Sequence, residues 1–336
     1  MALWKKVLVL IIMLGLGLPV PASALSYLNT EGLTIKPLLT TVDAPANHVV
    51  ASGGSYDGVA KVLVQFPGST SSYAAGSGSL LQAGGKQYLL TAAHLMVSNT
   101  ILAYFPGKST PYTGVSYVVH PNWTGDPKTG IDLALIKFNA PVDAPAYDFL
   151  REEISASATA DLAGYGRSGT GLTGDTVDSG TLRQGQNTFA EAFWSSVGNP
   201  YAYDFDDGSD SWNTIAKLLG KTNDFSGTTS DLGVKNDADV LTEVMTAPGD
   251  SGGPTFIGGK IAGVHSFGAT FGLPYDSDNA PLPNSTFGEL GGDVRVAPMA
   301  DWIDQNVTAV PVPGSACLLL TGLLGLLFLG RRPRSG

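Results

Sequence analysis

The sequence predicts an all-β fold of two β-rich halves with a closing helix. Short segments rich in Val, Tyr, Phe and Leu follow one another closely from about residue 48 to 140, and a second set extends from residue 161 to 269. Gly, Pro, Asn and Ser separate these segments, a pattern typical of sandwiches and barrels. Apolar residues at helical spacing over residues 296–307 predict one helix near the end.

The candidate strands can be placed in order along the chain. Each alternates apolar and polar positions or is a short apolar run between turn residues. The strands expected in the first half are 59–66, 85–93, 101–105, 114–120 and 131–138, and those in the second are 161–168 and 259–269. A proline-containing stretch, residues 138–158, suits a linker between the halves, and residues 25–47 read as an extended lead-in or propeptide.

The N-terminus is typical of a secretory signal peptide. Lys5 and Lys6 precede an apolar run, and Ala22-Ser23-Ala24 places small residues where cleavage requires them. We therefore expect residues 1–24 to be removed after export across a bacterial inner membrane. The alternative is an uncleaved membrane anchor.

The C-terminal segment, residues 309–336, holds an apolar run at about 316–330 followed by Arg331, Arg332 and Arg334. The run is short for a spanning helix, and the arginines predict that the extreme C-terminus stays in the cytoplasm. The segment resembles bacterial PEP-CTERM sorting signals, but Val312 replaces the Glu of the Pro-Glu-Pro motif that gives the family its name. This resemblance implies a transmembrane sorting helix, an exosortase-like partner enzyme and a location at the cell envelope or surface, or outside the cell after processing. A plain membrane anchor is the alternative.

Charge and cysteine content exclude some partners. With both ends set aside, the body carries 14 basic and 29 acidic residues, a net charge of −15. Such a surface repels phosphate backbones, so no nucleic-acid partner is expected. The one cysteine, Cys317, lies in the apolar C-terminal run, so the body must be stabilised by its core and not by disulfides.

An irregular insert at about 184–240 contains a cluster of acidic residues. Clustered carboxylates can bind Ca²⁺, but the spacing does not match an EF-hand loop. The two interpretations are a solvated acidic loop, which the spacing favours, and a weak calcium site. The residues concerned are Asp204, Asp206, Asp207 and Asp210.

The stretch "TAPGDSGGPTF", residues 246–256, surrounds Ser251 with glycine and proline. A serine hydroxyl is a weak nucleophile and needs a neighbouring base, most often histidine. The chain has four histidines, and His94 is the best placed, because it ends "YLLTAAH", where a strand meets small residues. Asp132, at the head of an apolar strand, is a candidate to orient the imidazole. For each of the two, a purely structural role is the alternative.

Three motifs occur in order along the chain: "TAAH" around His94, "DLAL" around Asp132 and "GDSGGP" around Ser251. Together they resemble the trypsin-like (chymotrypsin-fold) serine proteases, and the resemblance extends from about Val49 to the last helix. It implies a protease domain at 48–308 made of two antiparallel six-stranded β-barrels with a C-terminal helix. It also implies a secreted or envelope-associated serine endopeptidase that acts on protein or peptide substrates and needs no cofactor or metal.

The resemblance also implies the role of each residue. His94 would be general base and then acid, Asp132 the orienting acid, and Ser251 the nucleophile that forms an acyl-enzyme. The N–H groups of Gly249 and Ser251 would form the oxyanion hole. Asp250 would pair with an amine released by cleavage near Val49, and we expect that processing to switch the enzyme on.

Substrate-binding positions follow from the same resemblance. Met245 would line the floor of the first specificity pocket, and Ser266, Phe267 and Gly268 would pair with substrate and form the pocket wall. An apolar floor cannot pair with a basic side chain, so cleavage after apolar residues is expected.

Two other interpretations fit parts of the sequence. "GDSGG" also fits the nucleophile elbow of α/β-hydrolases, but no convincing helix follows Ser251 and the order of acid and histidine is wrong for that fold. The second is a catalytically inactive surface or matrix protein that uses the protease fold to bind partners. The presence of all three catalytic residues and of both oxyanion-hole residues favours an active enzyme.

Overall fold

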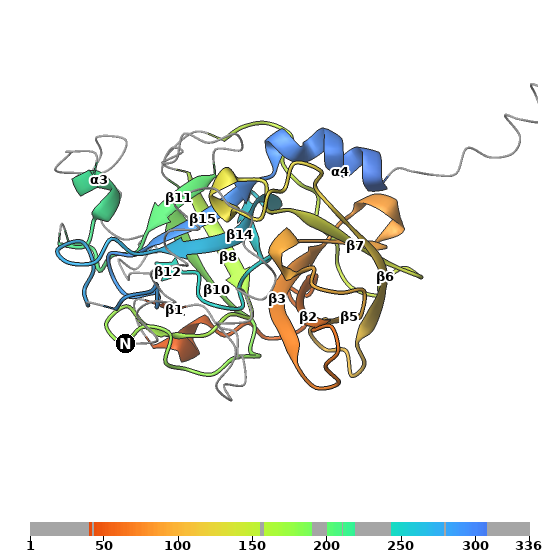
Figure 1. Ribbon diagram of the computed structural model, residues 1–336, viewed down its shortest axis with the longest axis horizontal. Helices are drawn as coiled ribbons and strands as arrows, with labels where there is room; N and C mark the ends of the chain where they lie inside the picture. The colour runs from red at the N-terminus through yellow and green to blue at the C-terminus, as the bar shows by residue number, and fades with distance from the viewer. Residues whose placement is uncertain are drawn as a thin grey trace, which may run out of the picture.

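The computed structural model describes residues 40–41, 44–154, 158–189, 200–209, 211–218, 243–278 and 280–307. In this part of the chain the structure is mostly β, as predicted, with few helices. Figure 1 shows two groups of strands lying side by side. The predicted signal peptide and the C-terminal sorting segment lie outside the described residues. Among the residues that are described, no helix is long and apolar enough to span a bilayer.

The first group is a closed six-stranded antiparallel barrel in the order β2-β3-β4-β7-β6-β5. Alternate side chains of its strands point inward and fill it, including Val62, Leu89 and Phe138. Its strands are β2 (Val59–Gln65), β3 (Tyr73–Leu80), β4 (Tyr88–Thr91), β5 (Ile101–Tyr104), β6 (Tyr112–Val119) and β7 (Ala134–Phe138). Four of the six lie within the segments expected from the sequence, β6 begins two residues before its expected segment, and β3 is additional.

The second group is a six-stranded antiparallel sheet in the order β10-β8-β13-β14-β15-β11. It is a half-barrel, because its edge strands β10 and β11 have no backbone ladder to each other among the described residues. Side chains bridge the two edges: Asn187 Nδ2 donates to the carbonyl of Asp204 at 2.8 Å, and the rings of Phe189 and Tyr201 stack at 4.5 Å. Its strands are β8 (Thr159–Gly164), β10 (Arg183–Thr188), β11 (Tyr201–Asp204), β13 (Pro254–Ile257), β14 (Lys260–Ala269) and β15 (Leu290–Arg295).

A small third sheet joins three short strands far apart in the sequence. Its order is β12-β1-β9, with β1 (Thr40–Thr41) between β12 (Val244–Met245) and β9 (Gly169–Thr170). A 3₁₀ turn, η2 (Pro45–His48), follows β1. The end of the lead-in therefore belongs to the same body as the sheets.

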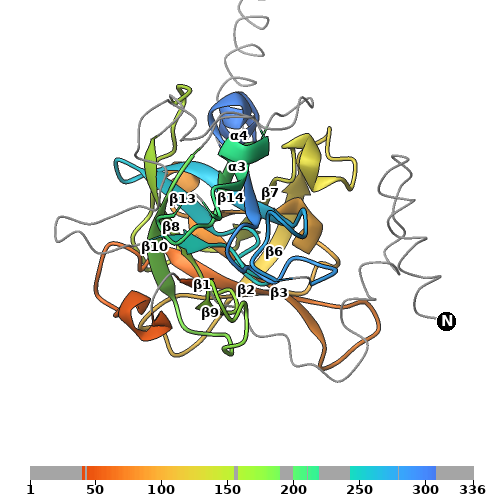
Figure 2. The same cartoon turned by 90° about the vertical axis from the view of Figure 1, so that its left-hand side faces the viewer.

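The predicted closing helix is present as a 3₁₀ turn, η7 (Ala297–Met299), that continues into α4 (Ala300–Val307). Its buried residues Ile303 and Val307 share one core cluster with Leu90 of the barrel and Val264 of the half-barrel. The helix therefore packs where the two sheets meet, and both views show it across one side of them (Figures 1 and 2). A second short helix, α3 (Thr214–Leu218), lies beyond β11.

Candidate active site

His94 lies where barrel strand β4 ends. The chain leaves β4 at Thr91 and enters a 3₁₀ turn, η4 (Ala93–Leu95), and the small side chains of Ala92 and Ala93 leave room for the imidazole. Its Nδ1 lies 2.5 Å from Oδ2 of Asp132, and its backbone N–H donates to Oδ1 of the same carboxylate at 2.8 Å. The side chain is 20% exposed, so the imidazole remains reachable from solvent.

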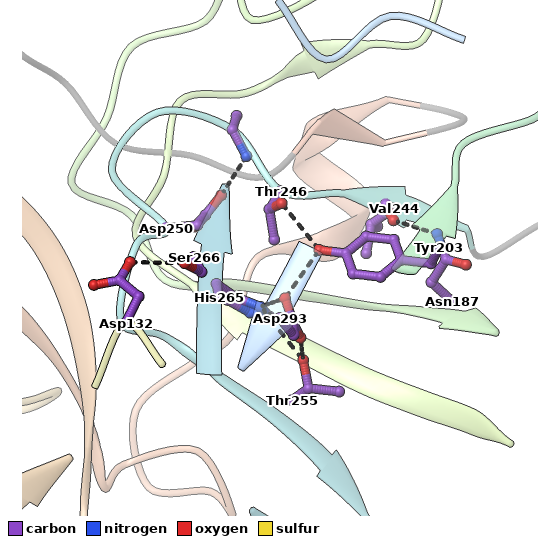
Figure 3. Close-up of polar contacts among 11 residues, drawn as sticks. Asp132, Asn187, Tyr203, Val244, Thr246, Asp250, Thr255, His265, Ser266 and Asp293 are labelled. Atoms are coloured by element: carbon purple, nitrogen blue, oxygen red, sulfur yellow. Dashed lines mark hydrogen bonds and ion pairs between the residues drawn. The ribbon is translucent and has the colours of Figure 1, made fainter. Parts of the chain in front are cut away.

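Asp132 precedes β7 and is completely buried. A buried carboxylate is costly unless hydrogen-bond donors compensate it. Three donors do so here: the N–H of His94, the His94 imidazole and the hydroxyl of Ser266, which donates to Oδ2 at 2.7 Å. Figure 3 shows the contact between Ser266 and Asp132. The carboxylate thus fixes the orientation of the imidazole from the barrel side, and β14 of the half-barrel fixes the carboxylate.

The pKa of His94 follows from the same contacts. Burial favours the neutral imidazole, but the charge of Asp132 and its hydrogen bond outweigh burial and raise the pKa above its ordinary value of 6.5. An imidazole held in one orientation beside a carboxylate can accept a proton and be stabilised when charged.

Ser251 lies in a tight loop between β12 and β13. The N–H of Gly253 donates to the carbonyl of Asp250 at 2.7 Å and closes the turn. The N–H of Gly252 donates to the carbonyl of His265 at 2.7 Å and attaches the loop to β14. Gly249 and Gly252 have φ values of 100° and 83°, a region that favours glycine. The glycines of the motif are therefore required by the shape of the loop.

The Ser251 loop packs directly against the segment that carries His94. A Cβ at Gly252 would lie 2.1 Å from Oγ1 of Thr91 and 2.8 Å from the N of Ala92. A Cβ at Gly76 of β3 would lie 2.2 Å from Leu95 and 2.7 Å from the carbonyl O of Ser251. The structure therefore brings the neighbours of Ser251 and of His94 into contact at the junction of the two sheets.

Ser77 of β3 holds the loop in place, although the sequence did not single it out. Its N–H donates to the carbonyl of Ser251 at 2.8 Å, and its hydroxyl donates to the carbonyl of Gly249 at 3.1 Å. Both loop carbonyls are thus turned toward the barrel. Within the described part of the chain, the N–H groups of Gly249 and Ser251 have no hydrogen-bond acceptor. These two donors are available to a ligand, as an oxyanion hole requires.

Asp250 is completely buried behind the loop. Its carboxylate accepts from the N–H of Gly166 at 2.5 Å and from the N–H of Ala247 at 3.0 Å. Burial raises the pKa of Asp250 to about 7, while the nearby charges of His265 and Arg183 lower it. The carboxylate therefore ties the Ser251 loop to the turn after β8.

Three of the four residues expected to bind substrate, Ser266, Phe267 and Gly268, lie together on β14. The strand pairs with β13 only as far as Val264, and with β15 as far as Ala269. Among the described residues, the part of β14 that holds Ser266, Phe267 and Gly268 is therefore next to a paired strand, β15, on one side only. Met245 is completely buried, and its Cε lies 3.7 Å from where a Cβ of Gly268 would be. The predicted pocket floor and pocket wall are therefore neighbours.

A second histidine–aspartate pair joins β14 to β15. His265 Nδ1 lies 3.1 Å from Oδ1 of Asp293, and both side chains are almost completely buried. Thr255 also donates to Asp293, and Tyr203 contacts both Asp293 at 3.4 Å and Thr246 at 2.9 Å (Figure 3). Burial would lower the pKa of His265, but Asp293 raises it. This network supports the strand that carries Ser266, and no sequence pattern indicates it.

The acidic cluster of the insert does not converge in the described residues. Asp204 accepts from the N–H of Ile215 at 2.9 Å, Asp206 from Gly208 at 2.6 Å, and Asp207 from Ser209 at 3.0 Å. Each carboxylate thus accepts from a backbone amide, locally for Asp206 and Asp207 and from α3 for Asp204. Asp210 lies outside the described residues, and the described part of the chain holds no group of three metal-ligating side chains.

Comparison with models of known protein families and with curated proteins finds no match.

Proposed function

We propose that this protein is a serine endopeptidase of the trypsin-like type, with His94, Asp132 and Ser251 as its catalytic residues. The observation that carries the proposal is the hydrogen-bonded pair of His94 and Asp132, whose Nδ1 and Oδ2 atoms lie 2.5 Å apart. This pair lies at the junction of the two sheets, where the Ser251 loop packs against the segment that carries His94. The closed barrel and the half-barrel, with the site between them and a closing helix, are consistent with that fold.

In the proposed mechanism, the hydroxyl of Ser251 attacks the carbonyl carbon of the scissile peptide bond while His94 takes its proton. Asp132 stabilises the imidazolium that forms. The negative charge on the carbonyl oxygen is stabilised by the N–H groups of Gly249 and Ser251, each contributing about 3–4 kcal/mol to the transition state. His94 then protonates the leaving amine, and water hydrolyses the acyl-enzyme by the same steps in reverse.

For specificity, we propose cleavage after apolar residues. Met245 offers no charge at the pocket floor, so a lysine or arginine side chain would lose its hydration without gaining a partner. A panel of peptides that differ only before the scissile bond, with Phe, Leu, Lys, Arg or Glu there, tests this. The highest kcat/KM is expected for Phe or Leu, and a clear preference for a charged residue would refute the assignment.

The test of the proposed activity is active-site labelling of the full chain with a fluorophosphonate probe. The wild-type protein should be labelled with one probe per chain, and mass spectrometry should place the probe on Ser251. The Ser251→Ala variant should not be labelled, whereas Ser116→Ala, an exposed serine on β6, should be labelled normally. A folded wild-type protein that neither reacts nor cleaves any peptide would favour a non-catalytic binding protein.

A further inference from the structure

Two described parts of the lead-in, β1 (Thr40–Thr41) and η2 (Pro45–His48), are built into the support of the Ser251 loop. The first part, β1, lies between two strands: Thr40 is opposite Met245 of β12 and Gly169 of β9, and both β1 residues are completely buried. Their hydroxyls add bonds to each neighbour, Thr40 to the carbonyl of Met245 at 3.2 Å and Thr41 to the carbonyl of Gly169 at 3.3 Å.

The two neighbours of β1 lead directly to the nucleophile loop. β12 ends at Met245 and continues into the loop that reaches Ser251. β9 follows a turn that is bonded to the same loop. In this turn the N–H of Gly166 donates to the Asp250 carboxylate, and the N–H of Arg167 donates to the carbonyl of Pro248 at 3.0 Å. A strand that joins β12 to β9 therefore fixes both sides of the loop relative to each other.

The second part of the lead-in, η2, contacts Arg183, one of the two cations whose charge acts on Asp250. The carbonyl of Pro45 accepts from Nε of Arg183 at 3.0 Å, and His48 donates from Nδ1 to the carbonyl of Gln184 at 2.9 Å. Arg183 is opposite Gly164 in the β8–β10 ladder, and a Cβ at Gly164 would lie 2.2 Å from Asp250. Facing residues of a ladder point to the same side, so Arg183 lies on the side of Asp250. Its charge lowers the pKa of that carboxyl.

The groups near the expected activation site are already engaged. The N–H of Val50 donates to the carbonyl of Leu182 at 3.0 Å, and Val49 forms a bridge with Arg183 and is 48% exposed. The carboxylate of Asp250 already accepts hydrogen bonds from two backbone N–H groups, those of Gly166 and Ala247, in the uncleaved chain. An amine created at Val49 would have to break these bonds to reach Asp250.

We infer that β1 and η2 are positioning elements of the active enzyme, which hold the Ser251 loop and its oxyanion donors in place without cleavage at Val49. This inference rests on the proposed function. It replaces the expectation that processing near Val49 switches the enzyme on.

The first experiment inserts the recognition sequence of a highly specific protease between His48 and Val49 of the full chain. The uncut protein should already react with the fluorophosphonate probe at the wild-type rate. After cutting and removal of the N-terminal piece, the rate should fall at least tenfold, and a synthetic peptide of residues 36–48 should restore it saturably. A rate that rises on cutting, or that stays unchanged once the piece is gone, would overturn the inference while leaving the proposed function intact. No reaction of the folded protein in any state would instead count against the proposed function.

The second experiment replaces Thr40 and Thr41 by valine, which keeps side-chain shape and removes the two hydroxyls. Turnover should be measured per site titrated with the probe. A positioning role predicts a lower kcat with little change in KM, and weaker binding of a peptide aldehyde, whose hemiacetal oxygen occupies the oxyanion hole. A purely structural role would lower the melting temperature but leave kcat per titrated site unchanged. Thr110→Val, at an exposed position, is the matched control.

Discussion

The hydroxyl of Ser266 and the imidazole of His94 meet on the same oxygen, Oδ2 of Asp132, at 2.7 and 2.5 Å. One donor comes from β14 of the half-barrel and the other from the turn after β4 of the barrel. The buried carboxylate therefore couples the orientation of the His94 imidazole to the packing of the two sheets.

Replacing Asp132 by asparagine should lower kcat about 10⁴-fold, because the imidazole loses the acceptor that sets its tautomer and the charge that stabilises its protonated form. Ser266→Ala removes one of three donors, so a smaller loss of about 1.5 kcal/mol, roughly tenfold in kcat, is expected. Steady-state kinetics on one peptide measures both. Asp143→Asn, which removes only an exposed ion pair with Lys108, should leave kcat unchanged. Equal losses for the Asp132 and Ser266 variants would contradict this ranking.

The pH dependence of kcat/KM should report the ionisation of His94. Only the neutral imidazole can accept the proton of Ser251, and the charge of Asp132 raises the pKa of His94 above 6.5. Activity should therefore increase with pH through a midpoint on the alkaline side of 6.5. In Asp132→Asn the charge is gone and burial favours the neutral form, so the residual activity should have its midpoint at lower pH. Profiles of both proteins on the same peptide measure the shift, and coincident midpoints would exclude His94 as the titrating base.

The sequence predicted the mostly β architecture and the last helix, because each has a local pattern. It predicted the pairing of His94 with Asp132, 38 positions apart, from the motifs around the two residues. It missed β3, whose residues "YAAGSGSL" have no apolar alternation. Those small residues are needed for packing: a Cβ at Gly78 would lie 2.7 Å from Leu89, and Gly76 is crowded between Leu95 and Ser251. It also missed β10, "RQGQNT", whose polar Asn187 is buried by bridging two strands.

The contact of Ser266 with Asp132 could not be predicted either, because the two residues are 134 positions apart. It depends on an irregularity in β14 between His265 and Phe267, which sets the direction of the Ser266 side chain. The role of Thr40 and Thr41 was missed for a related reason. A two-residue strand has no periodicity, and its partners lie in distant segments.

Gly76→Ala should disturb the loop that carries Ser251. The added methyl group would meet Leu95 at 2.2 Å and the Ser251 carbonyl at 2.7 Å, so one of them must move. Overpacking of this kind costs about 1–3 kcal/mol of folding free energy. We also expect slower labelling by the fluorophosphonate at temperatures where the variant is fully folded. Gly54→Ala is the matched control, because its methyl group would have only the Ala51 carbonyl near it, at 3.8 Å. Normal labelling of a destabilised Gly76 variant would show that Gly76 serves packing alone.

Glu289 should make the protein less stable as the pH rises. The side chain is completely buried, and although the N–H groups of Asn284 and Ser285 donate to it, burial and the charges of Asp276 and Asp278 raise its pKa from 4.5 to about 8. Between these two values the folded protein binds a proton that the unfolded chain has lost, so the free energy of unfolding falls as the pH rises from about 4.5 to about 8.

Glu289→Gln carries no titrating proton and should lose this part of the pH dependence. Urea unfolding of both proteins at intervals from pH 5 to pH 8 measures it: the wild-type free energy should decrease more steeply than that of the variant. Glu152→Gln changes an exposed carboxylate and should follow the wild-type slope. Parallel slopes for wild type and Glu289→Gln would mean that Glu289 is ionised in the folded protein over this range, with its charge balanced by the backbone N–H donors of Asn284 and Ser285.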